Sequence, residues 1–172
     1  HLNIGKRNNM SNIVKYLTED SIILDCGSKS QKSALEIISN NMSKLTSTNK
    51  DEIFEKLYER EKLGTTAFGN GIAIPHARIE GIDDAKIIIL KLDQAIDFNS
   101  IDNIKVDIII SLLVPKDSND VHIKLLSNIA TLLDKEIFMD QLRQANTASE
   151  GIAVPYTTLT LPTTPYVDNY GV

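Results

Sequence analysis

Two uninterrupted apolar stretches restrict the possible folds of this chain more than any other feature. Residues 85–92 and 106–114 each have the length of a strand and a continuous apolar centre. Strands with this pattern are usually covered on both faces, as they are where helices pack on both sides of a sheet. Neither stretch approaches the roughly 20 residues of a membrane-spanning helix, so we expect no membrane segment.

The segments before and after these two strands have apolar residues at helical spacing. From Ser30 onward apolar residues recur every three or four positions, and Ser28 or Ser30 is the expected N-cap. Further helices are expected at residues 51–61, 121–133 and 136–144. Because helices and strands alternate along the chain, the sequence predicts a single α/β domain with helices packed on a largely buried sheet.

Composition excludes several classes of protein. The 172 residues carry a net charge of −5, which argues against a general nucleic-acid binder because binding to a polyanion needs a basic patch. Cys26 is the single cysteine, so no intramolecular disulfide can form, and we expect a reducing cytoplasm. Imidazole chemistry is restricted to His76 and His122, since the third histidine, His1, is terminal.

The segment that ends in Pro75, His76, Ala77 and Arg78 is the first candidate site. Proline stiffens the chain directly before His76, and in an extended segment the side chains of His76 and Arg78 project to the same side. A neutral imidazole is a nucleophile, and a nearby guanidinium offsets the charge of a transferring phosphoryl group. Taken alone, this pattern also fits a loop histidine beside a surface arginine.

His122 is the second candidate. It lies in the first turn of the predicted helix 121–133, after the candidate caps Ser118 and Asp120, and it takes the first inward position. Helix N-terminal amides favour anions and disfavour an imidazolium. A neutral histidine there can bond a phosphate or a partner imidazole, although a helix-start histidine with a purely structural role fits equally well.

Two other kinds of site are excluded by spacing. Two internal histidines and one distant cysteine give no metal-ligand pattern. The glycine-rich stretch 64–71 lacks the Gly-Lys-Ser/Thr ending of a phosphate-binding loop, and it lacks the strand–turn–helix context of a dinucleotide site.

The sequence Gly-Asn-Gly-Ile-Ala-Ile-Pro-His at 69–76 resembles the phosphorylation-site signature of the mannitol/fructose-type enzyme IIA domains of the bacterial phosphotransferase system. The chain is most similar to the nitrogen-regulatory enzyme IIA branch. The resemblance runs from about Ser11 to Ser149 and includes the His122 helix and the blocks 34–38, 60–64, 101–103 and 112–115.

This resemblance implies a mixed β-sheet flanked by helices, with no metal and no organic cofactor. It implies that His76 accepts a phosphoryl group from a phosphohistidine carrier of the HPr type, and that His122 helps to hold the phosphohistidine. Arg60 matches a family arginine near the site, whereas Arg78 occupies a position where the family tolerates other residues. The loop residues Gly69, Asn70 and Gly71 belong to the signature.

Three functions remain open from the sequence. The first is a phosphorylatable regulator whose partners, such as kinases or potassium-transport regulators, respond to its phosphorylation state. The second is a sugar-transport enzyme IIA that passes phosphate to a IIB domain; the 172 residues include no IIB-like or membrane domain, which favours the regulator. The third is a non-catalytic interaction module with the same fold.

The ends of the chain depart from the family pattern. We expect residues 1–10 to be a leader or tag remnant, residues 11–149 to form the enzyme IIA domain, and residues 150–172 to be an atypical tail. The resemblance implies a final helix, but Gly151 and Pro155 are expected to stop it. The sequence therefore predicts an extended or disordered C-terminal segment.

Overall fold

The two apolar stretches form the central pair of a six-stranded sheet. Strands β5 (Lys86–Ile96) and β6 (Val106–Pro115) pair in antiparallel orientation along most of their length. The computed structural model describes residues 13–160, with side chains described as far as residue 154. Residues 1–10 and the end of the predicted tail lie outside this range.

The other strands flank this pair, in the order β1-β5-β6-β3-β2, with β4 also paired to β6. The pairs β1–β5, β3–β6 and β4–β6 are parallel, and β2–β3 is antiparallel, so the sheet is mixed. The predicted α/β class with a mixed sheet is therefore confirmed. The bounds are β1 (Ile22–Cys26), β2 (Ala67–Gly69), β3 (Ile72–Ala73) and β4 (His76–Ile79).

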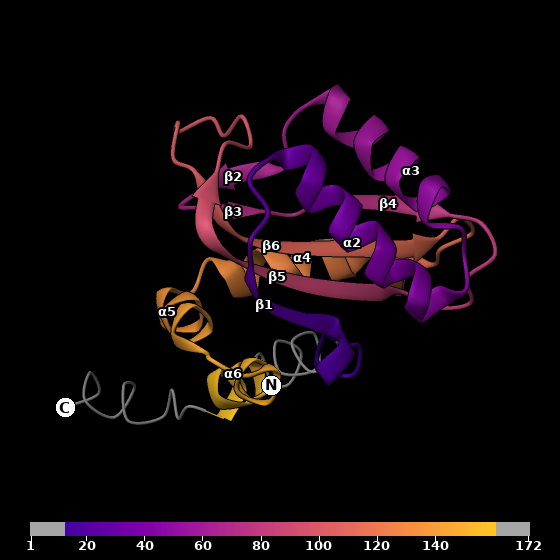
Figure 1. The fold of residues 1–172 in the computed structure, drawn as a ribbon. Helices are drawn as coiled ribbons and strands as arrows, with labels where there is room; N and C mark the ends of the chain where they lie inside the picture. The colour runs from indigo at the N-terminus through magenta and orange to yellow at the C-terminus, as the bar shows by residue number, and fades with distance from the viewer. Residues whose placement is uncertain (1–12, 161–172) are drawn as a thin grey trace.

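Helices cover both faces of the sheet (Figure 1). Helices α2 and α3 lie on one face, α4 lies on the other, and α5 and α6 follow toward the β1 side (Figure 1). A short 3-10 helix, η1, precedes β1. The bounds are η1 (Glu19–Ser21), α2 (Gln31–Thr46), α3 (Lys50–Leu63), α4 (Asp120–Leu133), α5 (Glu136–Gln144) and α6 (Ala148–Thr160).

Alternation along β5 explains the two-sided burial. Ile88 and Leu90 join the core beneath α2 and α3, whereas Ile87 and Ile89 join the core beneath α4 to α6. Successive side chains of a strand point to opposite faces, so a strand buried on both faces must be apolar at every position of its centre. None of the helices between residues 13 and 160 has the length and apolar character to cross a bilayer.

The prediction of an extended or disordered segment after residue 149 is wrong for residues 150–160, because α6 continues through Gly151 and Pro155 to Thr160. The hydroxyl of Thr147 accepts the amide of Glu150 at 3.1 Å and starts the helix. Gly151 then lies against β1, where an added Cβ would be 3.1 Å from Cδ1 of Ile22. Tertiary packing thus overrides the low helical preference of glycine and proline.

A substitution at Gly151 tests this packing. Leucine at position 151 would force α6 away from Ile22, so Gly151→Leu should lower the free energy of unfolding by about 1–3 kcal/mol despite the better helix propensity of leucine. The control Ala153→Leu changes an exposed position of the same helix and should stay within about 0.5 kcal/mol. Urea unfolding measures both, and equal effects would contradict the packing of α6 on β1.

Candidate functional site

The carbonyl group of Pro75 fixes the backbone just before His76. This oxygen accepts the amide of Leu112 and the hydroxyl of the fully buried Ser111, each at 3.0 Å. Proline has no amide hydrogen to donate to a neighbouring strand, so strand pairing is interrupted at Pro75, between β3 and β4. β4 then resumes pairing with β6, with His76 opposite Leu112, at an edge of the described sheet.

The ring of His76 has a defined tautomer. Its Nδ1 lies 2.8 Å from the carbonyl oxygen of Ile74, and because a carbonyl can only accept, Nδ1 must carry the hydrogen. The other nitrogen, Nε2, therefore keeps its lone pair. Burial lowers the pKa of His76 below its ordinary value, and the positive charge of Arg60 lowers it further, against the opposing effect of the Ile74 carbonyl.

A pocket of about 470 Å³ surrounds this imidazole. The structure brings all four predicted side chains to its walls: His76 and Arg78 from β4, Arg60 from α3 and His122 from α4. The pocket therefore spans the sheet edge from one covering helix layer to the other. Within the described residues no group of three His, Cys, Asp or Glu side chains is arranged to hold a metal.

Arg60 is held by the turn that follows its helix. Its Nη1 donates to the carbonyl of Gly64 at 2.8 Å. The neighbouring carboxylate of Glu61 is buried and accepts the amide of Thr66 at 3.1 Å as well as its hydroxyl. Burial raises the pKa of Glu61, although the bonds from Thr66 oppose this shift. These contacts fix the path from α3 to β2, and no sequence pattern pointed to them.

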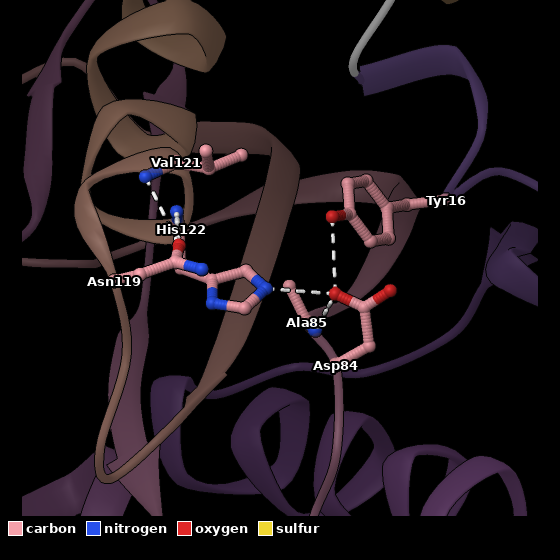
Figure 2. Close-up of polar contacts among 6 residues, drawn as sticks. All are labelled: Tyr16, Asp84, Ala85, Asn119, Val121 and His122. Carbon is pink, nitrogen blue, oxygen red and sulfur yellow. Dashed lines mark hydrogen bonds and ion pairs between the residues drawn. The ribbon is translucent and has the colours of Figure 1, made fainter.

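His122 is anchored at the start of α4. The side-chain oxygen of Asn119 accepts the amides of Val121 and His122 at 3.1 and 3.2 Å, so Asn119 is the N-cap rather than the predicted Ser118 or Asp120. Nε2 of His122 lies 2.8 Å from Oδ1 of Asp84. Figure 2 draws this contact between the ring and the carboxylate. Nδ1 of His122 is buried and has no hydrogen-bond partner among the described residues.

The predicted loop residues Gly69, Asn70 and Gly71 are not among the residues that line this pocket. They form the turn between β2 and β3, where Asn70 has a φ of 58° and its carbonyl accepts Nη2 of Arg143 at 2.8 Å. A Cβ on Gly71 would lie 2.9 Å from both Arg143 and the carboxylate of Asp107. Gly71 also has a φ of 79°, a left-handed conformation that favours glycine. The turn lies outside the walls of the pocket.

Apolar side chains complete the pocket and its rim. Ala77, Leu112 and Leu126 line it beside the charged groups. Leu63 and Ile123 also line it and are 85% and 52% exposed. An exposed apolar rim around a polar centre is typical of a surface that binds another protein.

Comparisons with known proteins identify the family of this chain. Residues 15–154 match the model of the family described as "Phosphoenolpyruvate-dependent sugar phosphotransferase system, EIIA 2". A nitrogen regulatory protein of Pseudomonas aeruginosa is 40% identical over 140 residues, which cover 81% of this chain and 91% of the relative. The crystal structure of nitrogen regulatory protein IIA-Ntr from Neisseria meningitidis has a TM-score of 0.79 and 30% identity, and covers 83% of this chain and 98% of that one.

A three-part component of a sugar-specific PTS system is less similar. The 2-O-alpha-mannosyl-D-glycerate-specific EIIABC component of Escherichia coli is 26% identical over 144 residues, which cover 82% of this chain but 22% of that protein. The match of the family model over most of the chain decides the class. The chain belongs to the EIIA type 2 family of the phosphoenolpyruvate-dependent sugar phosphotransferase system, and the similar proteins named above include nitrogen regulatory members.

The electrostatic coupling of Arg60 to His76 can be tested by NMR. Because the guanidinium disfavours a second positive charge, Arg60→Met should raise the pKa of His76, so that less of this ring is neutral at pH 6. Lys62→Met removes a positive charge from the exposed side of the same helix and is the control. Titration of ¹⁵N-labelled histidine measures both, and an unchanged or lower pKa in Arg60→Met would contradict the coupling.

Proposed function

We propose that this protein is a cytoplasmic phosphoryl carrier with a regulatory role, and that His76 accepts the phosphoryl group from a phosphohistidine carrier of the HPr type. One observation carries the proposal. The carbonyl of Ile74 accepts the hydrogen on Nδ1 of His76, so Nε2 of the neutral ring keeps its lone pair. The pocket that His76 lines is also lined by two arginines and a second histidine.

The proposed chemistry is an exchange of nitrogen–phosphorus bonds. Nε2 of His76 attacks the phosphorus in line, the bond to the donor imidazole breaks, and the donor nitrogen regains its lone pair. His76 retains its hydrogen on Nδ1 throughout. The lowered pKa of His76 supports this role, because a protonated ring has no lone pair on Nε2.

The surrounding cations offset the charge of the phosphoryl group. Arg60 and Arg78 enter the pocket from different elements, and His122 faces it from the start of α4. Positive groups placed before the phosphoryl arrives stabilise it without rearrangement. Residues 69–71 of the predicted loop do not line the pocket.

A regulatory role is favoured over sugar transport by similarity. Identity is 40% to a nitrogen regulatory protein and 26% to a transport component. We therefore propose that the partners are proteins that respond to the phosphorylation state, of the kind represented by kinases or potassium-transport regulators. The exposed apolar rim at Leu63 and Ile123 is suited to contact with the donor and with these partners.

Phosphotransfer from phosphoenolpyruvate tests the site. With enzyme I and an HPr-type carrier present, the protein should gain acid-labile phosphate, and His76→Ala should abolish it. His122→Ala should slow labelling by roughly tenfold or more, because a group that meets phosphoryl charge is lost. Lys124→Ala, at an exposed position of the same helix that does not line the pocket, is the control. Undiminished labelling of His76→Ala would refute the assignment.

A binding assay separates regulation from the other two functions. His76→Asp adds a negative charge at the site, so regulatory partners captured by the unphosphorylated protein should bind this variant and His76→Ala with different affinities. Equal affinities for both variants would indicate an interaction module that ignores the site. Rapid transfer of phosphate to a IIB domain in the presence of a sugar, without any regulatory partner, would indicate sugar transport.

A further inference from the structure

Asp84 is the hub of a polar cluster behind the pocket. Its Oδ1 accepts the amide of Ala85 at 2.8 Å, the hydroxyl of Tyr16 at 3.1 Å and Nε2 of His122 at 2.8 Å. Figure 2 shows the carboxylate between the two rings. The cluster thus joins the segment before η1, the start of β5 and the first turn of α4. Neither composition nor spacing singled out Asp84 or Tyr16.

Proton placement on His122 follows from this contact. Burial acts to raise the pKa of Asp84, but the hydrogen bonds from His122, Ala85 and Tyr16 outweigh it, and the pKa lies below its ordinary value. The carboxylate is therefore ionised near pH 7 and can only accept. Nε2 of His122 must carry a hydrogen, and Nδ1 is the one ring atom left for a further contact.

The remaining ring nitrogen is placed for a ligand in the pocket. The side chain of His122 is 13% exposed, and its Nδ1 is fully buried. The hydroxyl of Ser118 is also buried without a partner among the described residues, and both side chains line the pocket that contains His76. Buried polar atoms without partners are costly, so two of them on one pocket wall point to a polar group that occupies the pocket.

We propose that Asp84 is a positioning residue. It accepts the hydrogen on Nε2 of His122 and thereby directs Nδ1 of the same ring toward the phosphoryl group carried by His76. The hydroxyl of Ser118 contacts the same phosphoryl group. This inference rests on the proposed function. When the phosphoryl oxygens arrive, Nδ1 is the only site at which His122 can take up a proton from water and donate it to them. The carboxylate of Asp84 then balances the positive charge of the ring.

A double-mutant cycle tests whether Asp84 acts through His122. Asp84→Asn should lower the rate of phosphotransfer to His76 by roughly three- to tenfold. In the His122→Ala background the same substitution should change the rate by less than about twofold, because the group that Asp84 positions is gone. Asp83→Asn makes the same charge change at the exposed neighbouring position and should match the parent. Asp84→Glu, which keeps the charge, should recover part of the rate.

NMR of ¹⁵N-labelled histidine gives a readout that a loss of stability would not mimic. In the parent, Nε2 of His122 should be protonated at neutral pH, and in Asp84→Asn a mixture of tautomers should appear, since an amide both donates and accepts. The His76 tautomer should be the same in both proteins. Ser118→Ala should slow phosphotransfer without changing either tautomer.

Three results would overturn the inference. They are an unprotonated Nε2 on His122 in the parent, a rate for Asp84→Asn equal to that of the parent, or an equal loss from Asp84→Asn with and without His122. Failure of the proposed function is distinct, because the parent protein would then take up no phosphate at all, while the tautomer measurement would still report on the contact with Asp84.

Discussion

The hydrogen bonding of one carbonyl group, that of Pro75, underlies the whole site. Two donors from β6, a backbone amide and the hydroxyl of Ser111, hold this oxygen from inside the core. These two hydrogen bonds fix where β4 begins and therefore where His76 lies on the edge of the sheet. It also places the carbonyl of Ile74 against Nδ1, which decides the tautomer. A reactive histidine is thus oriented by backbone geometry, with no charged side chain in contact with its ring nitrogens among the described residues.

The remaining groups reach the pocket because the central strands are buried on both faces. Apolar packing holds α3 on one side of β5 and β6 and α4 on the other, and β4 lies at the edge between them. Arg60 and His122 therefore approach His76 from opposite layers. Ion pairs at an exposed surface contribute roughly 0–1 kcal/mol, so burial of the core, rather than attraction between charges, fixes this arrangement.

Charge is distributed unevenly around the pocket. Burial and the charge of Arg60 lower the pKa of His76, which favours its neutral form, whereas three hydrogen bonds lower the pKa of the more exposed Asp84. Glu61 is buried beside Thr66, and its pKa is raised. The pocket is lined by three positively charged side chains, Lys56, Arg60 and Arg78, and by one carboxylate, Glu59, which lies 3.9 Å from Nζ of Lys56. The excess of positive charge among these lining residues favours an anion in the pocket.

Periodicity in the sequence determined the α/β class and the two central strands, and together with one local motif it singled out His76 and His122, since these follow from short-range spacing. It offered Ser28 or Ser30 as the cap of α2, and the structure has Ser30 in that position. Tertiary structure decided the rest. Gly151 and Pro155 break helices in isolation, yet α6 passes through both because its close approach to Ile22 and the burial of Val154 repay the cost. Asp84 and His122 are 38 residues apart, and no local pattern links a carboxylate to a ring across that distance; only packing of α4 on the sheet brings them within 2.8 Å.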